Sequence, residues 1–145
     1  MISVFAALVL SIYGIDGDGG RSPVLAYIVA LTAFGATVAT FLNFFNTKIS
    51  FQRGLISIFI VGVLSVFAYA NCYHAFALIE GGELVEIDFL TALYFSIVTL
   101  TTLGYGDFAP AESLRLMAAL QAILGYLYLG TVVAIMSNTG FYKSS

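Results

Sequence analysis

The residues with the clearest capacity for chemistry lie between positions 99 and 107. Hydroxyl side chains open this stretch, glycines alternate through it and an acid closes it: Thr99, Thr101, Thr102, Gly104, Tyr105, Gly106 and Asp107. Glycine adopts backbone torsions that other residues avoid, so alternating glycines allow successive carbonyl oxygens to turn the same way. A row of such oxygens can replace the hydration shell of a cation. The stretch therefore predicts a cation site built from backbone carbonyls.

The rest of the chain is unusually apolar. Of its 145 residues, 61% are hydrophobic and only 9% are charged, too few to cover a soluble protein of this length. We therefore expect an integral membrane protein whose partner is the lipid bilayer. The net charge of −3 gives no basic surface for nucleic acid. One histidine and one cysteine offer no zinc site, and no nucleophile–base pair is visible. We expect no enzyme, no cofactor and no small-molecule substrate.

Three segments are long enough to span a bilayer without a charged residue, at 24–45, 55–79 and 116–137. The first fifteen residues are apolar but short, and we predict a short or tilted span there, with an interfacial segment as the alternative. The fold class expected is an all-α membrane protein with three to four transmembrane helices. We divide it into N-terminal helices at 1–50 and a second domain at 51–145.

Charge sets the predicted orientation. Lys48 and Arg53 flank the tight loop between two strong spans, and Lys143 follows the last span. Positive residues favour the cytoplasmic side, so these regions and both termini are predicted to be cytoplasmic. All 8 acidic residues then fall on the outer side. The scheme fits a protein of the plasma (inner) membrane.

The region between the last two spans does not read as a simple loop. An apolar run at 89–100 is too short to cross a bilayer, and this length is typical of a re-entrant helix. Asp88 stands just before the run, where its carboxylate can cap the helix N-terminus. Non-helical backbone at membrane depth is tolerated only where protein buries it or where it lines a water-filled path. Carbonyls after this helix would therefore face an aqueous axis.

At this point the sequence resembles the potassium channel family, whose filter motif is T-V/I-G-Y/F-G-D. The matching residues are Thr102-Leu103-Gly104-Tyr105-Gly106-Asp107, with leucine in place of the usual valine or isoleucine. The stretch 92–101 looks like the pore helix of the same family. The resemblance implies an outer helix at 55–79, a pore helix at 89–101, an extended filter at 102–107 and an inner helix at 114–138.

The resemblance also implies a mechanism. Carbonyls of Thr102, Leu103, Gly104 and Tyr105, with the Thr102 hydroxyl, would bind K⁺ in stacked sites, and Gly106 would complete the filter. Since each ion in the family is surrounded by rings of four oxygens, a homotetramer around a central pore is implied. Ions would then cross passively by repulsion between adjacent sites. K⁺ is the permeant ligand.

Residues behind the filter depart from the family pattern. Relatives pair the filter aspartate with a tryptophan or a glutamate, whose positions here hold Tyr94 and Val98. We predict that the Tyr94 hydroxyl donates a hydrogen bond to Asp107. The side chains of Thr101 and Tyr105 are expected to point away from the pore and brace the filter.

The inner helix contains Gly125 where relatives carry a hinge glycine. A glycine inside a helix costs up to about 1 kcal/mol relative to alanine, so bending and close packing are both open explanations. Leu129, Val133 and Ser137 follow on one helical face and are predicted to line a cavity. His74 is either a packing residue or a pH sensor.

Three other functions fit the sequence less well. A weakly selective cation channel would disrupt the part of the motif that holds Tyr105 and Asp107, which are present here. A potassium transporter subunit would carry four degenerate filter segments in one long chain, whereas this chain has one nearly intact segment. A non-conducting scaffold would leave the filter motif unexplained.

Overall fold

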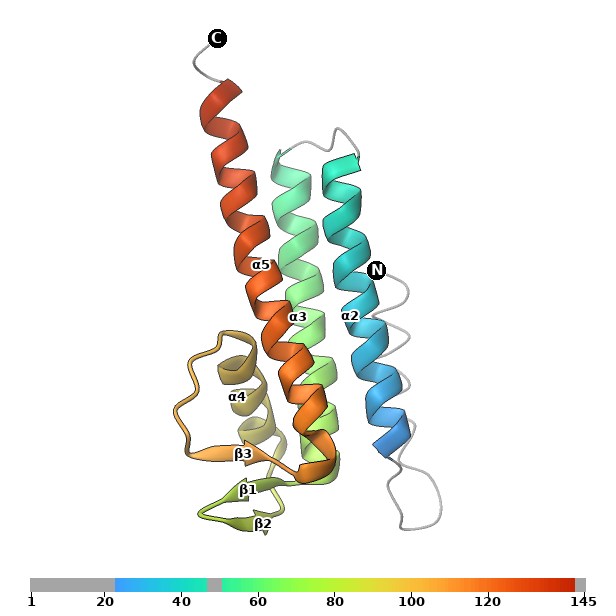
Figure 1. Cartoon of the computed structure of the whole chain (residues 1–145), viewed down its shortest axis with the longest axis vertical. Coiled ribbons are helices and arrows are strands. Elements are labelled where there is room, and N and C mark those ends of the chain that lie inside the picture. Colours follow the sequence, from blue (N-terminus) through green and yellow to red (C-terminus); the bar gives the residue numbers. More distant parts are fainter. Residues whose placement is uncertain (1–22, 47–50, 143–145) are drawn as a thin grey trace.

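The computed structural model describes residues 23–46 and 51–142 of the chain. Three long helices lie side by side in it (Figure 1): α2 (Pro23–Asn46), α3 (Phe51–Phe76) and α5 (Arg115–Tyr142). The predicted short segment at 1–15 lies outside the described residues.

Within the described part, two helices are long and apolar enough to cross a membrane. They cover Gln52–Phe76 and Glu112–Ala134. The third predicted span, 24–45, is helical as α2, in which Tyr27–Thr40 forms a shorter apolar helical segment. The charged residues of the two candidate spans, Arg53, Glu112 and Arg115, all lie close to the first residue of their helix, so the rest of each helix is free of charge.

A short helix, α4 (Phe89–Leu100), occupies the predicted re-entrant region. It starts at the end of the molecule where α3 finishes and runs back beside α3 and α5 (Figure 1). The chain then returns along the outside of α4 to the end from which it came. The segment therefore begins and finishes at the same end of the three long helices.

A small antiparallel sheet closes that end, and the sequence reasoning did not foresee it. Its strands are β1 (Leu78–Glu80), β2 (Glu83–Val85) and β3 (Phe108–Pro110), in the order β2-β1-β3. Gly81 and Gly82 join β1 to β2 with φ values of 59° and 95°, the positive torsions that a tight hairpin turn requires. In register, Leu78 pairs with both Val85 and Pro110. The sheet therefore ties the residues after position 107 to the end of α3.

The bounds of three predicted helices need correction. The helix expected at 55–79 begins earlier, at Phe51, and ends at Phe76, because Ala77 adopts a φ of 64° and Leu78 then begins β1. The helix expected at 89–101 ends at Leu100, with Thr101 as its C-cap. The inner helix expected at 114–138 begins at Arg115, after the 3₁₀ turn η1 (Glu112–Leu114), and continues to Tyr142.

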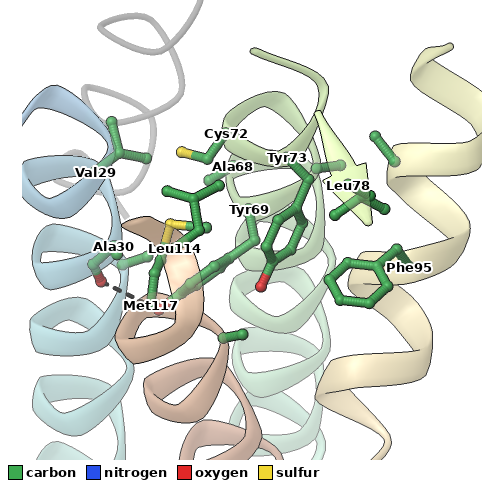
Figure 2. Close-up of a cluster of buried hydrophobic side chains, with 14 of the residues drawn as sticks. Val29, Ala30, Ala68, Tyr69, Cys72, Tyr73, Leu78, Phe95, Leu114 and Met117 are labelled. Carbon is green, nitrogen blue, oxygen red and sulfur yellow. Dashed lines mark hydrogen bonds between the residues drawn. The ribbon is translucent and has the colours of Figure 1, made fainter. Parts of the chain in front are cut away.

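The core lies where the four helices meet near the sheet. Figure 2 shows Tyr69 and Tyr73 of α3 reaching between residues of α2, α4 and α5. Ala30 of α2 is fully buried, and its small side chain lets the Tyr69 hydroxyl approach its carbonyl at 3.4 Å. The Tyr73 ring packs edge-on against Phe95 of α4, with ring centroids 4.7 Å apart. This core fixes α4 against the long helices.

Candidate functional site

The N-terminus of α4 is capped as the sequence predicts. The Asp88 carboxylate accepts a hydrogen bond of 2.9 Å from the Thr91 N–H. Hydrogen bonds from Thr91 hold the pKa of Asp88 below its ordinary value. His74 of α3 contacts the carbonyl of Ile87, with Nδ1 2.9 Å from the oxygen. The start of α4 is therefore held by its own cap and by α3.

The C-terminal end of α4 carries the predicted filter. Three successive N–H groups bond back to the last turn of the helix: Thr101 to Ile97 at 2.9 Å, Thr102 to Thr99 at 3.1 Å and Leu103 to Val98 at 3.0 Å. The Thr101 hydroxyl adds a bond of 2.7 Å to the Ile97 carbonyl. The first residues of the motif are therefore held by hydrogen bonds to the last turn of α4.

The backbone of the motif is neither helix nor strand, and its torsions alternate. Positive φ values occur at every second residue: 58° at Thr102, 57° at Gly104 and 81° at Gly106. Glycine accepts these values freely, whereas threonine does so at a cost in conformational energy. The glycines of the motif therefore occupy two of the three positions at which the backbone requires a positive φ.

Asp107 is held behind the motif by Tyr94. The Tyr94 hydroxyl donates a bond of 2.6 Å to Asp107 Oδ2, and the Phe108 N–H donates one of 3.0 Å to Oδ1. The predicted Tyr94–Asp107 bond is thus confirmed in the structure. This bond lowers the pKa of Asp107 and raises the pKa of Tyr94 to about 12. The Tyr94 and Tyr105 rings stack with centroids 6.4 Å apart.

Every residue from 101 to 107 is exposed in the single chain. Leu103 and Tyr105 leave 57% and 68% of their surface uncovered. One chain therefore presents the motif on its outside and does not enclose it.

Gly125 of α5 packs tightly against the end of α4. A Cβ built at this glycine would overlap the Leu100 carbonyl oxygen and would lie 2.9 Å from the carbonyl carbon. The structure therefore supplies a packing reason for the glycine. Leu129 and Val133 of the predicted cavity face are 63% and 55% exposed. The Ser137 side chain lies outside the described side chains.

The sequence reasoning missed a buried polar cluster that joins three helices. We call Tyr73 of α3, Ser96 of α4 and Gln121 of α5 the three-helix cluster; all three are fully buried. A glutamine inside an uncharged span is costly in a membrane, which is the signal that could have pointed to it. Among the described residues, no group of His, Cys, Asp or Glu could hold a metal ion.

Comparison with known proteins places the chain in a family. The family described as "Ion channel" matches residues 53–141. The chain is 38% identical over 79 residues to probable potassium channel protein 2 of Methanocaldococcus jannaschii, covering 52% of this chain and 22% of that protein.

Two further relatives come from distant organisms. The chain is 41% identical over 51 residues to the calcium-gated potassium channel TvoK of Thermoplasma volcanium, covering 34% of this chain and 15% of the relative. It is 38% identical over 70 residues to TWiK family of potassium channels protein 9 of Caenorhabditis elegans, covering 45% and 11%. The chain thus spans less than a quarter of the length of these relatives. No solved structure gives a significant match.

The family match covers the re-entrant path, the motif and almost all of the two helices in the described part of the chain that could cross a membrane. The three relatives named as potassium channels align with parts of the same chain. The chain therefore belongs to the potassium channel family of ion channels.

Proposed function

We propose that this chain is one of four identical subunits of a K⁺-selective channel that conducts K⁺ passively through Thr102-Leu103-Gly104-Tyr105-Gly106-Asp107. The observation that carries the proposal is the alternating backbone at 102–106, suspended from α4 and backed by the Tyr94–Asp107 bond. In this proposal α3 is the outer helix, α4 the pore helix and α5 the inner helix. Residues 51–145 form the pore domain and 1–50 the N-terminal helices.

The ion ligands are backbone oxygens. Carbonyls of Thr102, Leu103, Gly104 and Tyr105, with the Thr102 hydroxyl, form rings of four around each K⁺ ion. Binding in such rings replaces the hydration shell, and repulsion between neighbouring ions moves them onward. The exposure of residues 101–107 in one chain supports this arrangement, since three further copies would cover that surface.

The orientation proposed places the sheet outside the membrane and both termini in the cytoplasm. Acidic residues at the sheet end support it: Glu80, Glu83, Glu86, Asp88, Asp107 and Glu112. Arg53 lies at the opposite end, in the first turn of α3. Positive residues favour the cytoplasmic side, which makes the sheet end extracellular.

Support behind the filter comes from Tyr94, Asp107 and Thr101. The Tyr94 hydroxyl fixes the carboxylate that closes the motif, and its ring stacks on Tyr105. The Thr101 hydroxyl bonds back to the pore helix. Leu129, Val133 and Ser137 line the cavity on the inner side of the filter. In this proposal Gly125 serves packing, whereas Gly130 has no atom within 4 Å of an added Cβ.

Reversal potentials test the proposal. The purified full chain is reconstituted in liposomes with K⁺ on one side and Na⁺ on the other. We expect reversal near the K⁺ equilibrium potential, and loss of that selectivity in Gly104→Ala, because alanine strains a φ of 57°. The matched control is Gly35→Ala on α2, where an added Cβ has no neighbour within 4 Å. Robust current that reverses near zero in the wild type would identify a non-selective cation channel instead.

A further inference from the structure

We propose that Gln121 is a positioning residue for the ion filter: it fixes the C-terminal half of α4 on α5 through Ser96. The inference rests on the proposed function, because it assigns Gln121 a part in holding the ion ligands in place. The three-helix cluster, which no part of the filter motif includes, carries the argument.

Gln121 joins two neighbouring helices with both ends of its amide. Its Nε2 donates to the Ser96 carbonyl at 3.1 Å and contacts Ser96 Oγ at 2.7 Å. Its Oε1 accepts a bond of 2.8 Å from the Tyr73 hydroxyl. The Ser96 hydroxyl in turn donates to the Val66 carbonyl of α3 at 2.9 Å. In the described part of the chain, no buried side-chain nitrogen or oxygen lacks a partner.

A second contact joins α4 to α5 one helical turn further along both helices. Gly125 follows Gln121 by four residues on α5, and it meets Leu100, which follows Ser96 by four residues on α4. Residues four apart lie on the same face of a helix. The two helices therefore touch at two successive levels, first through hydrogen bonds and then through direct backbone contact.

The part of α4 that holds the start of the filter lies between these two contacts. The carbonyls that hold the N–H groups of residues 101–103 belong to Ile97, Val98 and Thr99, which lie between Ser96 and Leu100. A rotation or slip of α4 relative to α5 would move these carbonyls and the first ion ligands together. The position of Gln121 therefore bears on where Thr102 and Leu103 lie.

Hydrogen bonds suit this task better than apolar contact. Apolar side chains of the right volume tolerate small shifts, whereas a bonded amide has one favourable distance and direction. Breaking the cluster would also leave buried polar groups unpaired, which raises the cost of any alternative register. Ion ligands tolerate little misplacement, so support of this kind affects selectivity as well as stability.

Substitutions at Gln121 test the inference in the full chain reconstituted in liposomes. Gln121→Met keeps the length of the side chain and removes its hydrogen bonds. We expect the K⁺-to-Na⁺ permeability ratio to fall about tenfold, the lower end of what loss of an outer-shell partner costs at metal-ion sites. Ser96→Ala should lower the ratio in the same direction, and the effect of the double variant should be smaller than the sum of the two single effects, because both substitutions remove the contact between Gln121 and the Ser96 hydroxyl.

The matched control is Thr131→Val, on the same helix. Thr131 is also buried, but its hydroxyl bonds only to the Leu127 carbonyl of its own helix at 2.6 Å. We expect this variant to keep the wild-type permeability ratio. Thermal unfolding of each detergent-solubilised variant is measured in parallel, so that a general loss of stability is separated from a loss of selectivity.

Each outcome has a distinct meaning. A selective wild type with an equally selective Gln121→Met overturns the positioning role and leaves the proposed function intact. A ratio that falls equally in Gln121→Met and Thr131→Val also overturns it, because any buried polar residue would then serve. A wild type without K⁺ selectivity overturns the proposed function and the positioning role together. A ratio lowered only by Gln121→Met and Ser96→Ala, without additivity, supports the inference.

Discussion

The two halves of α5 have similar apolar compositions and very different surroundings. Up to Gly125, the helix buries Met117, Ala118, Gln121 and Leu124 against the rest of the chain. From 126 to 136, Thr131 is the one buried side chain among those described. The difference arises because α4 lies beside the first half only (Figure 1). Tyr128 of the second half still contacts Thr37 of α2. The exposed residues of that half, such as Leu129 and Val133, must find neighbours outside this chain, in lipid, water or further subunits.

The largest effect should come from a side chain added at Gly125, where the first half of α5 contacts Leu100 of α4. Gly125→Ala places a methyl group on the Leu100 carbonyl, and backbone on both sides prevents relief. We expect loss of folded, conducting protein, measured by size-exclusion chromatography and by K⁺ flux. Gly130→Ala is the control in the second half, where the added Cβ has no neighbour within 4 Å. Gly125→Ala with wild-type flux would show that α4 and α5 are less tightly joined than the structure indicates.

A second large effect should show whether Leu129 and Val133, in the second half of α5, face water. If Leu129 and Val133 line a cavity, Leu129→Cys and Val133→Cys should react with a charged thiol reagent and lose most of their K⁺ flux. Phe59→Cys on α3 is the control, because Phe59 is 72% exposed on a surface that we assign to lipid. The native Cys72 is buried and should not interfere. Equal reaction rates at the three positions would contradict the assignment of the cavity face.

An intermediate effect is expected at the Tyr94–Asp107 bond behind the proposed filter. Tyr94→Phe removes the hydrogen bond that lowers the pKa of Asp107, so this pKa should rise toward its ordinary value. The charged form of Asp107 is present above its pKa and is lost as pH falls through it. We therefore expect external acid to inhibit K⁺ flux at a higher pH in Tyr94→Phe than in the wild type.

The control for this experiment is Tyr126→Phe, an exposed tyrosine at the start of the second half. It should keep the acid sensitivity of the wild type. Identical acid inhibition in Tyr94→Phe and the wild type would mean that the Tyr94–Asp107 bond does not support conduction.

The smallest effect is expected where α5 begins. Arg115 and Glu112 form a pair of 3.5 Å, but both side chains are largely exposed, at 64% and 84%. Exposed ion pairs contribute little because water and salt screen them. Glu112→Gln should leave the midpoint of thermal unfolding and the K⁺ flux unchanged. A clear loss of stability would indicate that this pair contacts a further subunit.

Local features of the fold could be predicted from the sequence because they depend on neighbouring residues. Uncharged runs predicted α3 and α5, and the short run at 89–100 with Asp88 before it predicted a capped α4. The family motif also placed Tyr94 opposite Asp107, and the structure contains that bond.

Tertiary structure decided what depends on residues far apart in the sequence. The sheet needs β3 to return beside β1, a pairing of three-residue strands too short to show a pattern. The packing reason for Gly125 comes from the approach of Leu100, which no local pattern reports. Gln121 looks like an isolated polar residue in the sequence, and only the packing of α3, α4 and α5 gives it partners. Hydrophobic pattern and capping follow from local chemistry, whereas contact between helices depends on how the whole chain packs.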